Sequence, residues 1–585
     1  MFLNVRGILT KFSINQNNWM KDFYSHFCMQ FYFRNVNMVL KNGLVVFLLS
    51  AAFKVNAADN GPEVQTPLGR VRGVYKKSFE GYPYSSFEGI PYAKPPINEL
   101  RFEEPVPVEP WNEVIDATKS SACPQRDLKG LGPVIGEEDC LYLNIYVPGE
   151  VNTKNSYDIH FLIHGGALMN GSGQMASDSF MMDNQNVIFV SFNYRLGPLG
   201  FLSTEDNEVP GNNGMKDQVM ALKWLRDNIH SFGGNPQSIT ISGFSAGGSC
   251  VHLLYLSPWS KDLFIRGISN SGSAISPWFL KEKPLIFAQK LAADVGCPTS
   301  PTSALKACLK EKPANLLMEQ IENFMEYVHL PISPFGVVID TWANNPFLPE
   351  HPYSLLERGK ILDLPWIVSV NRDEGIFPSG YFCTDQEAIN RDFLDKAHLL
   401  LDYNYTYPEK DRKIFAKKIR DFYFGQNDIS EENFDKLTQM FGDRLFKSGI
   451  EISAKLQASA NKESVYVYFF NYDESINKLA DFFCPEMKVS GIAHCQDTVF
   501  AYGCFLFHEL AENDKHMKKI FNIFMNSFIS KGKPFISENL EWLPTKGNNL
   551  SFMNITNVDN IKMDTAASLY PTDIWSELNK SEFQN

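Results

Sequence analysis

Short runs of apolar residues, many of them β-branched or aromatic, alternate along the chain with longer stretches of helical periodicity. The short runs predict buried strands, centred near Ile145, Phe161, Ile188, Ile239, Ile367 and Tyr466. The longer stretches predict helices over residues 215–229, 246–256 and 516–530, with more helices within 297–400 and 411–460 and an antiparallel edge within 62–87. Strands interleaved with helices predict an α/β fold around one large sheet.

One predicted strand runs directly into a predicted helix through a serine. Ile239 and Ile241 belong to the strand, the helix begins at Ala246, and Ser245 occupies the corner between Gly243 and Gly247. A side chain at either glycine would block a turn tight enough to lift the serine hydroxyl above the sheet. Ser245 is therefore a candidate nucleophile.

A second glycine-rich turn follows the apolar strand at residues 159–163. Its sequence is His-Gly-Gly-Ala, from His164 to Ala167. Bare backbone at a strand end can bring N–H groups to a substrate oxygen, as an oxyanion hole requires. The expected donors are the N–H groups of Gly166, Ala167 and Ala246, although a Gly-Gly pair taken alone would only indicate a turn.

A serine nucleophile also needs a histidine base and a carboxylate that orients it. In an α/β sheet of this kind the acid and then the histidine follow the serine along the chain. His398, His508 and His516 lie in segments with helical periodicity and charged neighbours, which favours surface positions, whereas His494 lies in a loop-like stretch. His494 is the expected base.

Two carboxylates compete for the acid position. Asp373 and Glu374 both follow the predicted strand at residues 366–370. The residues alone do not decide between them.

Several longer motifs occur in one order along the chain and resemble those of the type-B carboxylesterase/cholinesterase family. They are Glu88-Gly89-Ile90-Pro91-Tyr92-Ala93, Glu138-Asp139-Cys140-Leu141-Tyr142-Leu143-Asn144, Asn193-Tyr194-Arg195, Leu199-Gly200-Phe201, Gly233-Gly234-Asn235-Pro236 and the serine elbow. The resemblance starts near Pro62 and covers nearly the whole mature chain, which also resembles secreted insect carboxylesterases.

The resemblance implies an α/β-hydrolase fold with a large mixed, mostly parallel central sheet, helices on both faces and a helical lid region. It also implies that Glu374 is the acid of a Ser-Glu-His triad, that Ser271 supports the triad from behind, and that Asp497 occupies the family's acidic position three residues after His494. Two disulfides are implied as well, Cys123–Cys140 and Cys297–Cys308.

Two residues depart from the family pattern beside the site. Phe244 stands where an acid often precedes the nucleophile, and Cys495 replaces a small residue after the histidine. Phe244 predicts a less polar pocket and apolar ester substrates, a juvenile hormone or an odorant ester among them. No aromatic residue lies between Cys123 and Cys140 to attract a quaternary ammonium, so choline esters are not expected.

Two non-catalytic roles are the alternatives to ester hydrolysis. The family includes adhesion proteins that keep the fold and lose the catalytic residues, and a carrier of apolar ligands could retain an unused serine elbow. Both are disfavoured because the triad and oxyanion motifs are all present.

Composition limits the partners. The formal net charge of −13 disfavours nucleic acid and anionic membrane surfaces. The sequence has no Cys-x-x-Cys motif, and His160 and His164 fall on a predicted strand, where the two rings lie too far apart to share an ion. The expected partner is a small-molecule ester, with no cofactor, no metal and no membrane span.

The N-terminal region predicts secretion. Residues 38–57 combine a basic start, an apolar run and a small-residue cleavage site, as a signal peptide does. We expect residues 1–37 to be a non-native or untranslated extension and residues 58–585 to form a single catalytic domain. The apolar run at 40–53 is shorter than the about 20 residues that cross a bilayer.

Cysteines and glycosylation sequons fit an extracellular protein. Cys250, Cys383, Cys484, Cys495 and Cys504 remain unassigned, and their odd number implies at least one free thiol. Glycans are expected at Asn404, Asn549, Asn554 and Asn579. Asn170 is also in a sequon, but its closeness to the oxyanion turn predicts a buried, unmodified side chain.

Overall fold

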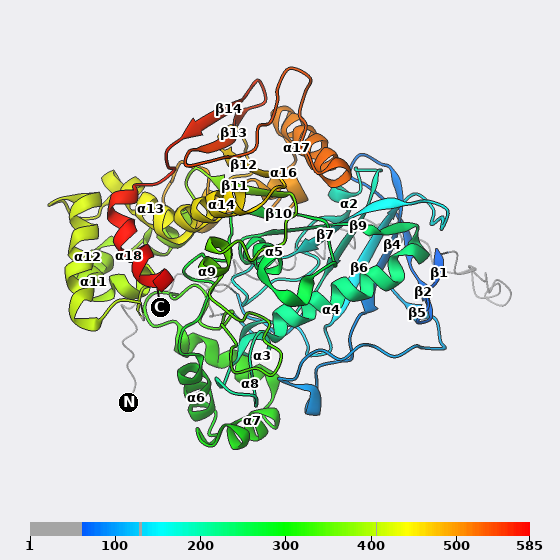
Figure 1. Ribbon diagram of the computed structural model, residues 1–585, viewed down its shortest axis with the longest axis horizontal. Helices are drawn as coiled ribbons and strands as arrows, with labels where there is room; N and C mark the ends of the chain where they lie inside the picture. The colour runs from blue at the N-terminus through cyan, green and yellow to red at the C-terminus, as the bar shows by residue number, and fades with distance from the viewer. Residues whose placement is uncertain (1–60, 128–131, 405, 585) are drawn as a thin grey trace, which may run out of the picture. The chain divides into compact units, whose positions relative to one another are not determined.

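A mixed sheet organises residues 61–585 and holds eleven of the described strands, in the order β14-β13-β12-β11-β10-β9-β7-β8-β6-β4-β3 (Figure 1). The computed structural model describes residues 61–127, 132–404 and 406–584, with side chains up to residue 578. The predicted extension, the signal peptide and the start at Ala58 lie outside these residues.

Strands β7 to β13 pair in parallel, and antiparallel strands complete both edges of the sheet. The strands of this sheet are β3 (Val74–Lys77), β4 (Pro83–Pro91), β6 (Tyr142–Pro148), β7 (Tyr157–Ile163), β8 (Val187–Phe192), β9 (Gly234–Phe244), β10 (Arg266–Asn270), β11 (Trp366–Asn371), β12 (Val465–Phe470), β13 (Leu550–Asn557) and β14 (Asn560–Ala566). A separate small sheet contains β1 (Glu63–Gln65), β2 (Arg70–Arg72) and β5 (Ile115–Asp116). The predicted large, mostly parallel sheet is confirmed.

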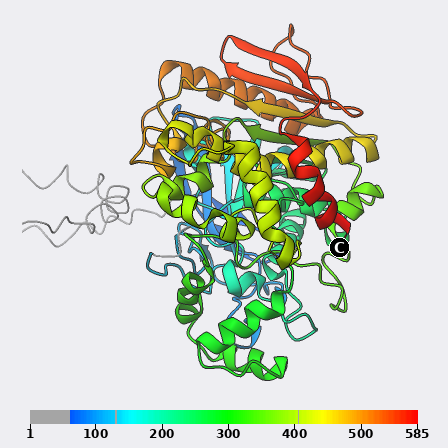
Figure 2. The ribbon, with the colours of Figure 1, turned by 90° about the vertical axis from the view of Figure 1, so that its left-hand side faces the viewer.

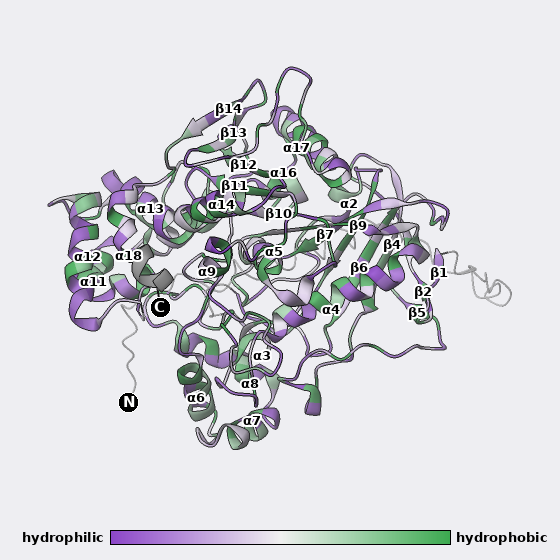
Figure 3. Cartoon of the chain, viewed as in Figure 1, coloured by the Kyte–Doolittle hydropathy of each residue, from purple (hydrophilic) through white to green (hydrophobic). Residues whose placement is uncertain are grey.

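Alternate side chains of the strands enter two different cores, one on each face of the sheet. On β12, Val465 and Val467 belong to the larger core, whereas Tyr466 and Tyr468 belong to the smaller one. This period of two follows from the strand geometry. Because apolar side chains are needed on both faces, β8 and β12 are almost entirely apolar, whereas β9 and β10 also carry polar residues. Figure 3 shows the hydropathy of each strand by its colour.

Helices cover both cores. The longer ones are α4 (Asn213–Asn228), α5 (Ala246–Leu256), α6 (Pro284–Asp294), α7 (Thr302–Lys310), α11 (Gln386–Leu400), α12 (Glu409–Phe424), α13 (Phe434–Gly442), α14 (Ser448–Ala460), α17 (Glu512–Lys531) and α18 (Thr572–Gln584). Helices α4, α5 and α14 contribute buried residues to the larger core, and α17 contributes Phe521, Phe524 and Phe528 to the smaller one. Figure 2 shows α17 beside the hairpin β13–β14.

Short helices connect these elements. They are α2 (Asp178–Met181), α3 (Gly197–Phe201), α8 (Ala314–Glu319), α9 (Pro352–Glu357), α10 (Ile376–Ser379), α15 (Leu479–Phe483) and α16 (Thr498–Tyr502). None of the helices of the described residues is long and apolar enough to cross a membrane.

The six predicted strands correspond to β6, β7, β8, β9, β11 and β12, and the three predicted helices to α4, α5 and α17. Helix α17 ends where Gly532 adopts φ 68°, the left-handed conformation that favours glycine. One expectation was wrong: His508 lies in a loop and not in a helical segment. The hairpin β13–β14 was missed, although its alternating apolar residues carry the signal of two strands.

Candidate active site

Ser245 lies on a sharp turn between β9 and α5, with φ 55° and ψ −125°. A Cβ at Gly247 would lie 2.1 Å from the Ile163 carbonyl oxygen, and one at Gly243 would lie 2.4 Å from the Gly247 carbonyl oxygen. Both distances are shorter than real side-chain contacts, so the turn can form only with glycine at these positions. The Ser245 N–H donates to the Asn270 carbonyl at 2.8 Å and anchors the turn to β10.

The structure brings Ser245, His494 and Glu374 together from three distant segments. His494 Nε2 lies 2.8 Å from Ser245 Oγ, and His494 Nδ1 lies 2.6 Å from Glu374 Oε2. The His494 and Glu374 side chains are 4% and 0% exposed. Because the carboxylate accepts the Nδ1 proton, Nε2 is left to accept the proton of the serine hydroxyl.

Asp373, the competing acid, points elsewhere. Its carboxylate accepts hydrogen bonds from the Ile492 N–H at 2.9 Å and from Arg372 Nε at 2.7 Å. It therefore fixes the loop that precedes His494 and leaves the histidine to Glu374.

A buried polar network supports Glu374 from behind. Ser271 Oγ and the Asn371 N–H each donate to Glu374 Oε1 at 2.7 Å. Asn371 Nδ2 in turn donates to Ser271 Oγ at 2.8 Å and to Asp497 Oδ1 at 3.1 Å. All four side chains are fully buried. Glu374 is thereby fixed in one orientation toward His494.

Asp497 is a buried carboxylate that is satisfied by neutral donors. It accepts hydrogen bonds at 2.7 to 2.8 Å on Oδ2 from Asn270, Ser369 and Tyr468. Burial is the main cause that raises the pKa of Tyr468 well above its ordinary value, so its hydroxyl stays a donor. The three donors Asn270, Ser369 and Tyr468 were not predicted from the sequence. They lie on the adjacent parallel strands β10, β11 and β12, and Asn270 is at the carboxyl end of its strand, where sites of this fold class form.

The three expected oxyanion donors follow two paired strands: Gly166 and Ala167 come just after β7, and Ala246 comes directly after Ser245 at the end of β9. Gly166 and Ala167 adopt φ 107° and 57°, and Ala246 is the first residue of α5. Among the described residues, none of these three N–H groups donates a backbone hydrogen bond. Ser333, a fully buried residue missed from the sequence, donates from Oγ to the Ala167 carbonyl at 2.6 Å. Unpaired N–H groups at a helix start and a strained turn suit a developing negative charge.

Aromatic rings lie on His494. The Phe377 ring is stacked on it at 5.5 Å between centroids, and the Phe446 ring lies 4.3 Å away. These rings exclude water from the sides of the imidazole and make its surroundings apolar.

The two departures from the family pattern are both buried. Phe244 is 1% exposed and lies in the smaller core beside Tyr502, so it offers little surface to a substrate. Cys495 adopts φ 62° and is also buried. Burial and the neighbouring Glu374 carboxylate raise the pKa of its thiol well above the ordinary value, which keeps the thiol protonated.

Three disulfides join segments of the described residues. The structure contains Cys123–Cys140 and Cys297–Cys308, the two expected pairs, and a third bond, Cys383–Cys484, that the sequence did not assign. Cys250, Cys495 and Cys504 are buried free thiols. Among the described residues there is no group of side chains that could hold a metal ion.

The sequons differ in exposure. Asn549 is exposed, Asn404 and Asn554 are partly exposed, and the side chain of Asn579 lies outside those described. Asn170 is also partly exposed, so the expectation that it is buried was wrong.

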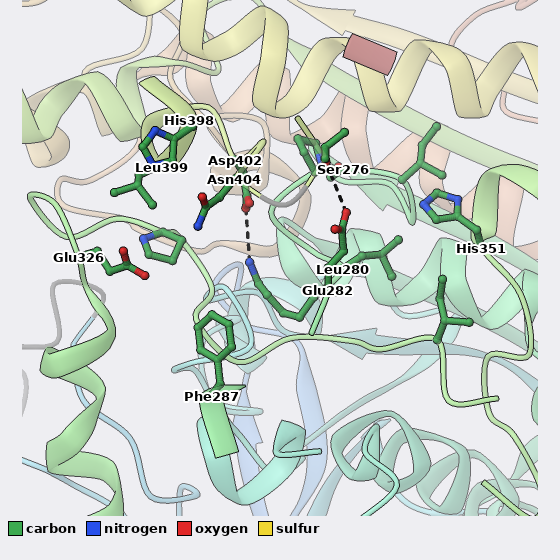
Figure 4. A pocket seen from close by; sticks show the side chains of 16 residues that line it. Ser276, Leu280, Glu282, Phe287, Glu326, His351, His398, Leu399, Asp402 and Asn404 are labelled. Carbon is green, nitrogen blue, oxygen red and sulfur yellow. Dashed lines mark hydrogen bonds and ion pairs between the residues drawn. The ribbon is translucent and has the colours of Figure 1, made fainter. Parts of the chain in front are cut away.

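A cavity of about 100 Å³ lies apart from these residues, since none of the triad lines it. His351 and His398 lie at opposite sides of it, and Lys281 pairs with Asp402 between them at 3.4 Å (Figure 4). Burial lowers the pKa of both histidines to about 4, so they are neutral at pH 7. Asn404, one of the sequon residues, also lines this cavity.

Comparison with known proteins agrees with this geometry. The sequence profile of the carboxylesterase family matches residues 60–574. Venom carboxylesterase-6 of Apis mellifera is 38% identical over 532 residues, which are 89% of this chain and 95% of that protein. Juvenile hormone esterase of Tribolium castaneum is 36% identical over 507 residues, which are 82% of this chain and 85% of that protein.

A solved structure has the same fold. The crystal structure of juvenile hormone esterase from Manduca sexta, with OTFP covalently attached, matches with a TM-score of 0.79 and 26% sequence identity. The match covers 89% of this chain and 100% of that one. With the family profile matched over most of its length, the chain belongs to the carboxylesterase family.

Proposed function

We propose that this carboxylic ester hydrolase cleaves apolar esters through an acyl-enzyme formed on Ser245, with His494 as base and Glu374 as its orienting acid. The observation that carries the proposal is the unbroken hydrogen-bonded series from Ser245 Oγ through the His494 ring to Glu374 Oε2. A non-catalytic adhesion or carrier protein has no need for this alignment.

The proposed reaction has two steps. His494 Nε2 takes the hydroxyl proton as Ser245 Oγ attacks the ester carbonyl, and the oxyanion of the tetrahedral intermediate accepts hydrogen bonds from Gly166, Ala167 and Ala246. The intermediate collapses with loss of the alcohol, which receives the proton from His494. Water, deprotonated by the same histidine, then attacks the acyl-enzyme, and the acid leaves as Ser245 recovers its proton.

The preference for apolar esters is supported by the surroundings of His494. Phe377 and Phe446 cover the imidazole, and within the described part of the chain Glu374 is the one charged group hydrogen-bonded to its nitrogens. Juvenile hormone and odorant esters are apolar substrates of this kind. The names of the Tribolium and Manduca relatives favour testing the hormone ester first.

Secretion is part of the proposal. Three disulfides among the described residues fit an oxidising compartment. The signal-like segment at 38–57 and the sequon residues Asn404, Asn549, Asn554 and Asn579 point the same way.

The test is hydrolysis of p-nitrophenyl esters of increasing acyl length by protein that starts at Ala58. We expect turnover to rise with acyl length and to fall by at least about 10⁴-fold in Ser245→Ala, because loss of the nucleophile removes the covalent route. If the Ser245→Ala variant turns over the ester as fast as the wild type, the proposal is rejected. A wild-type protein that is folded but inactive would favour a binding role.

A further inference from the structure

The three expected oxyanion donors belong to peptides whose carbonyl groups are all held from the opposite side. The N–H and C=O groups of a planar trans peptide point in opposite directions. A hydrogen bond to the carbonyl therefore fixes the direction of the N–H group on the next residue. The hydrogen-bond donors to these three carbonyls therefore determine the direction of each N–H group.

Backbone groups hold two of the three carbonyls. The Gly166 carbonyl, whose peptide carries the Ala167 N–H, accepts hydrogen bonds from the N–H groups of Met169 and Asn170 at 2.9 and 3.0 Å. The Ser245 carbonyl, whose peptide carries the Ala246 N–H, accepts one from the Ser249 N–H at 3.0 Å.

A side chain holds the third carbonyl. The Gly165 carbonyl oxygen, whose peptide carries the Gly166 N–H, lies 2.8 Å from His164 Nδ1. A carbonyl can only accept, so Nδ1 must carry the proton and donate it. The aim of the Gly166 N–H thus depends on one histidine.

The His164 ring is fixed on two sides. It stacks on the Tyr194 ring at 4.3 Å and 17°, and the Tyr194 hydroxyl donates to the His164 carbonyl at 3.0 Å. On another side, a Cβ at Gly171 would lie 2.3 Å from His164 Nδ1, so only glycine leaves room for the ring.

Gly171 is held in turn by the disulfide loop Cys123–Cys140. Gln125 in this loop accepts from the Gly171 N–H at 2.8 Å and donates to the Gly171 carbonyl at 2.9 Å. The ring position is therefore set from outside the oxyanion turn.

His164 is also an unfavourable residue to bury. It is 2% exposed, and its Nε2 atom has no hydrogen-bond partner among the described residues. A buried polar atom without a partner costs about 1–3 kcal/mol. Burial lowers the pKa of the ring to about 4, so it stays in the neutral form with one proton to place. A leucine would avoid both costs, which indicates that the Nδ1–H group has a purpose.

We infer that His164 is a positioning residue, which aims the Gly166 N–H at the substrate oxyanion by holding the Gly165 carbonyl. The inference rests on the proposed serine esterase function. The orientation of the Gly166 N–H then depends on the His164 side chain, whereas main-chain hydrogen bonds orient the N–H groups of Ala167 and Ala246.

Three variants at this position separate the role from general stability. His164→Leu removes the donor, His164→Gln moves it one bond farther out, and His164→Asn keeps an N–H group at the δ position. Loss of one oxyanion donor costs about 10²–10³-fold in kcat, and a misdirected donor should cost less. We expect kcat for a p-nitrophenyl ester to fall about 10- to 100-fold in the Leu and Gln variants, with KM within about twofold, and to recover in the Asn variant.

The second readout is inhibition by a trifluoromethyl ketone, whose serine adduct carries an oxyanion. Its affinity should fall by the same factor as kcat, because both depend on the Gly166 N–H. The matched control is His160→Leu, a buried histidine on β7 whose Nε2 lies 2.7 Å from Ser242 Oγ. This control should lose stability and keep its kcat.

The possible results separate the positioning role of His164 from the proposed esterase function. Wild-type kcat in a folded His164→Leu or His164→Gln variant, unchanged ketone affinity, or an equal loss in His160→Leu would overturn the role of His164 and leave the esterase intact. If the leucine variant does not fold, the Gln and Asn variants decide, since equal kcat values in these two would also overturn the role. Absence of Ser245-dependent turnover in the wild type would reject the proposed function itself.

Discussion

The two halves of the catalytic centre are built differently. On the oxyanion side, backbone N–H and C=O groups make most of the contacts, and glycines let them approach. On the acid side, side chains make most of the contacts, since Ser271, Asn371 and Asp497 form a buried network behind Glu374 to which the backbone contributes the Asn371 N–H. The halves differ because an oxyanion needs N–H donors left bare, whereas a carboxylate needs its second oxygen occupied.

Two buried histidines, one near each half, have Nδ1 atoms with opposite hydrogen-bonding roles. His164 Nδ1 donates to the Gly165 carbonyl, while His252 Nδ1 accepts from the Ala274 N–H at 3.1 Å in the loop that carries Ser271. Both rings are stacked on an aromatic ring at 4.3 Å, Tyr194 and Trp366 respectively. The two histidines therefore differ in the role of Nδ1, which is a donor in His164 and an acceptor in His252.

The largest effect is expected from breaking the acid side at its centre. Glu374→Gln keeps the shape of the side chain but removes the charge that stabilises the imidazolium and selects the His494 tautomer. We expect kcat to fall by about 10³–10⁴-fold, as in related triads, while the ketone affinity falls less because the oxyanion donors are intact. Steady-state kinetics measures the effect, and Asp373→Asn is the control. A larger loss in Asp373→Asn than in Glu374→Gln would mean that the acid is misassigned.

A smaller effect is expected from loosening the network behind the acid. Ser271→Ala removes one of the two donors to Glu374 Oε1 and leaves the Asn371 N–H. A hydrogen bond to a charged group is worth about 1.5–3 kcal/mol, of which the remaining donor recovers part, so we expect kcat to fall about tenfold. Ser273→Ala, a buried serine of the same loop that bonds Ser276, is the matched control. Equal kcat values in the two variants would show that the network does not orient Glu374.

The smallest effect concerns stability and compares the two histidines directly. Burial lowers the pKa of His164 to about 4 and that of His252 to about 3. Below about pH 6.5 the unfolded chain binds a proton that the folded protein refuses, so stability present above this pH is lost as the pH falls toward the folded pKa. Each histidine should lower the free energy of unfolding by about 1.4 kcal/mol per pH unit.

Urea unfolding between pH 7 and pH 5 measures this slope. His164→Asn and His252→Gln should each flatten it by a similar amount, whatever their stability at pH 7. Curves that stay parallel to the wild type would show that these histidines do not titrate on unfolding.

The sequence predicted the parts of this centre that are local in the chain. The elbow at Ser245 and the turn at His164 are short sequence patterns. Their glycines can be predicted because a side chain at these positions would collide with the backbone of the turn itself or of its neighbours. The family resemblance supplied Glu374 where the residues alone left Asp373 open, and the structure gives the two carboxylates different partners.

The remaining parts depend on packing between distant segments. Cys383 and Cys484 are 101 residues apart, and nothing near either one marks its partner. Ser333 holds the Ala167 carbonyl across 166 residues, and Asn371 joins Ser271 to Asp497 only because β10 and β11 are adjacent in the sheet. His508 was misplaced because the charged and apolar residues around it resemble a helical pattern, whereas its N–H donates to the Asn477 side chain in a loop.

The proposed nucleophilic role of Ser245 is tested by the mass of the protein after reaction with a p-nitrophenyl organophosphate. We expect one adduct per chain, located on Ser245 by peptide mapping, with one equivalent of p-nitrophenol released and no reaction in Ser245→Ala. A folded protein that gains no adduct, or gains it on another residue, would show that Ser245 is not the nucleophile.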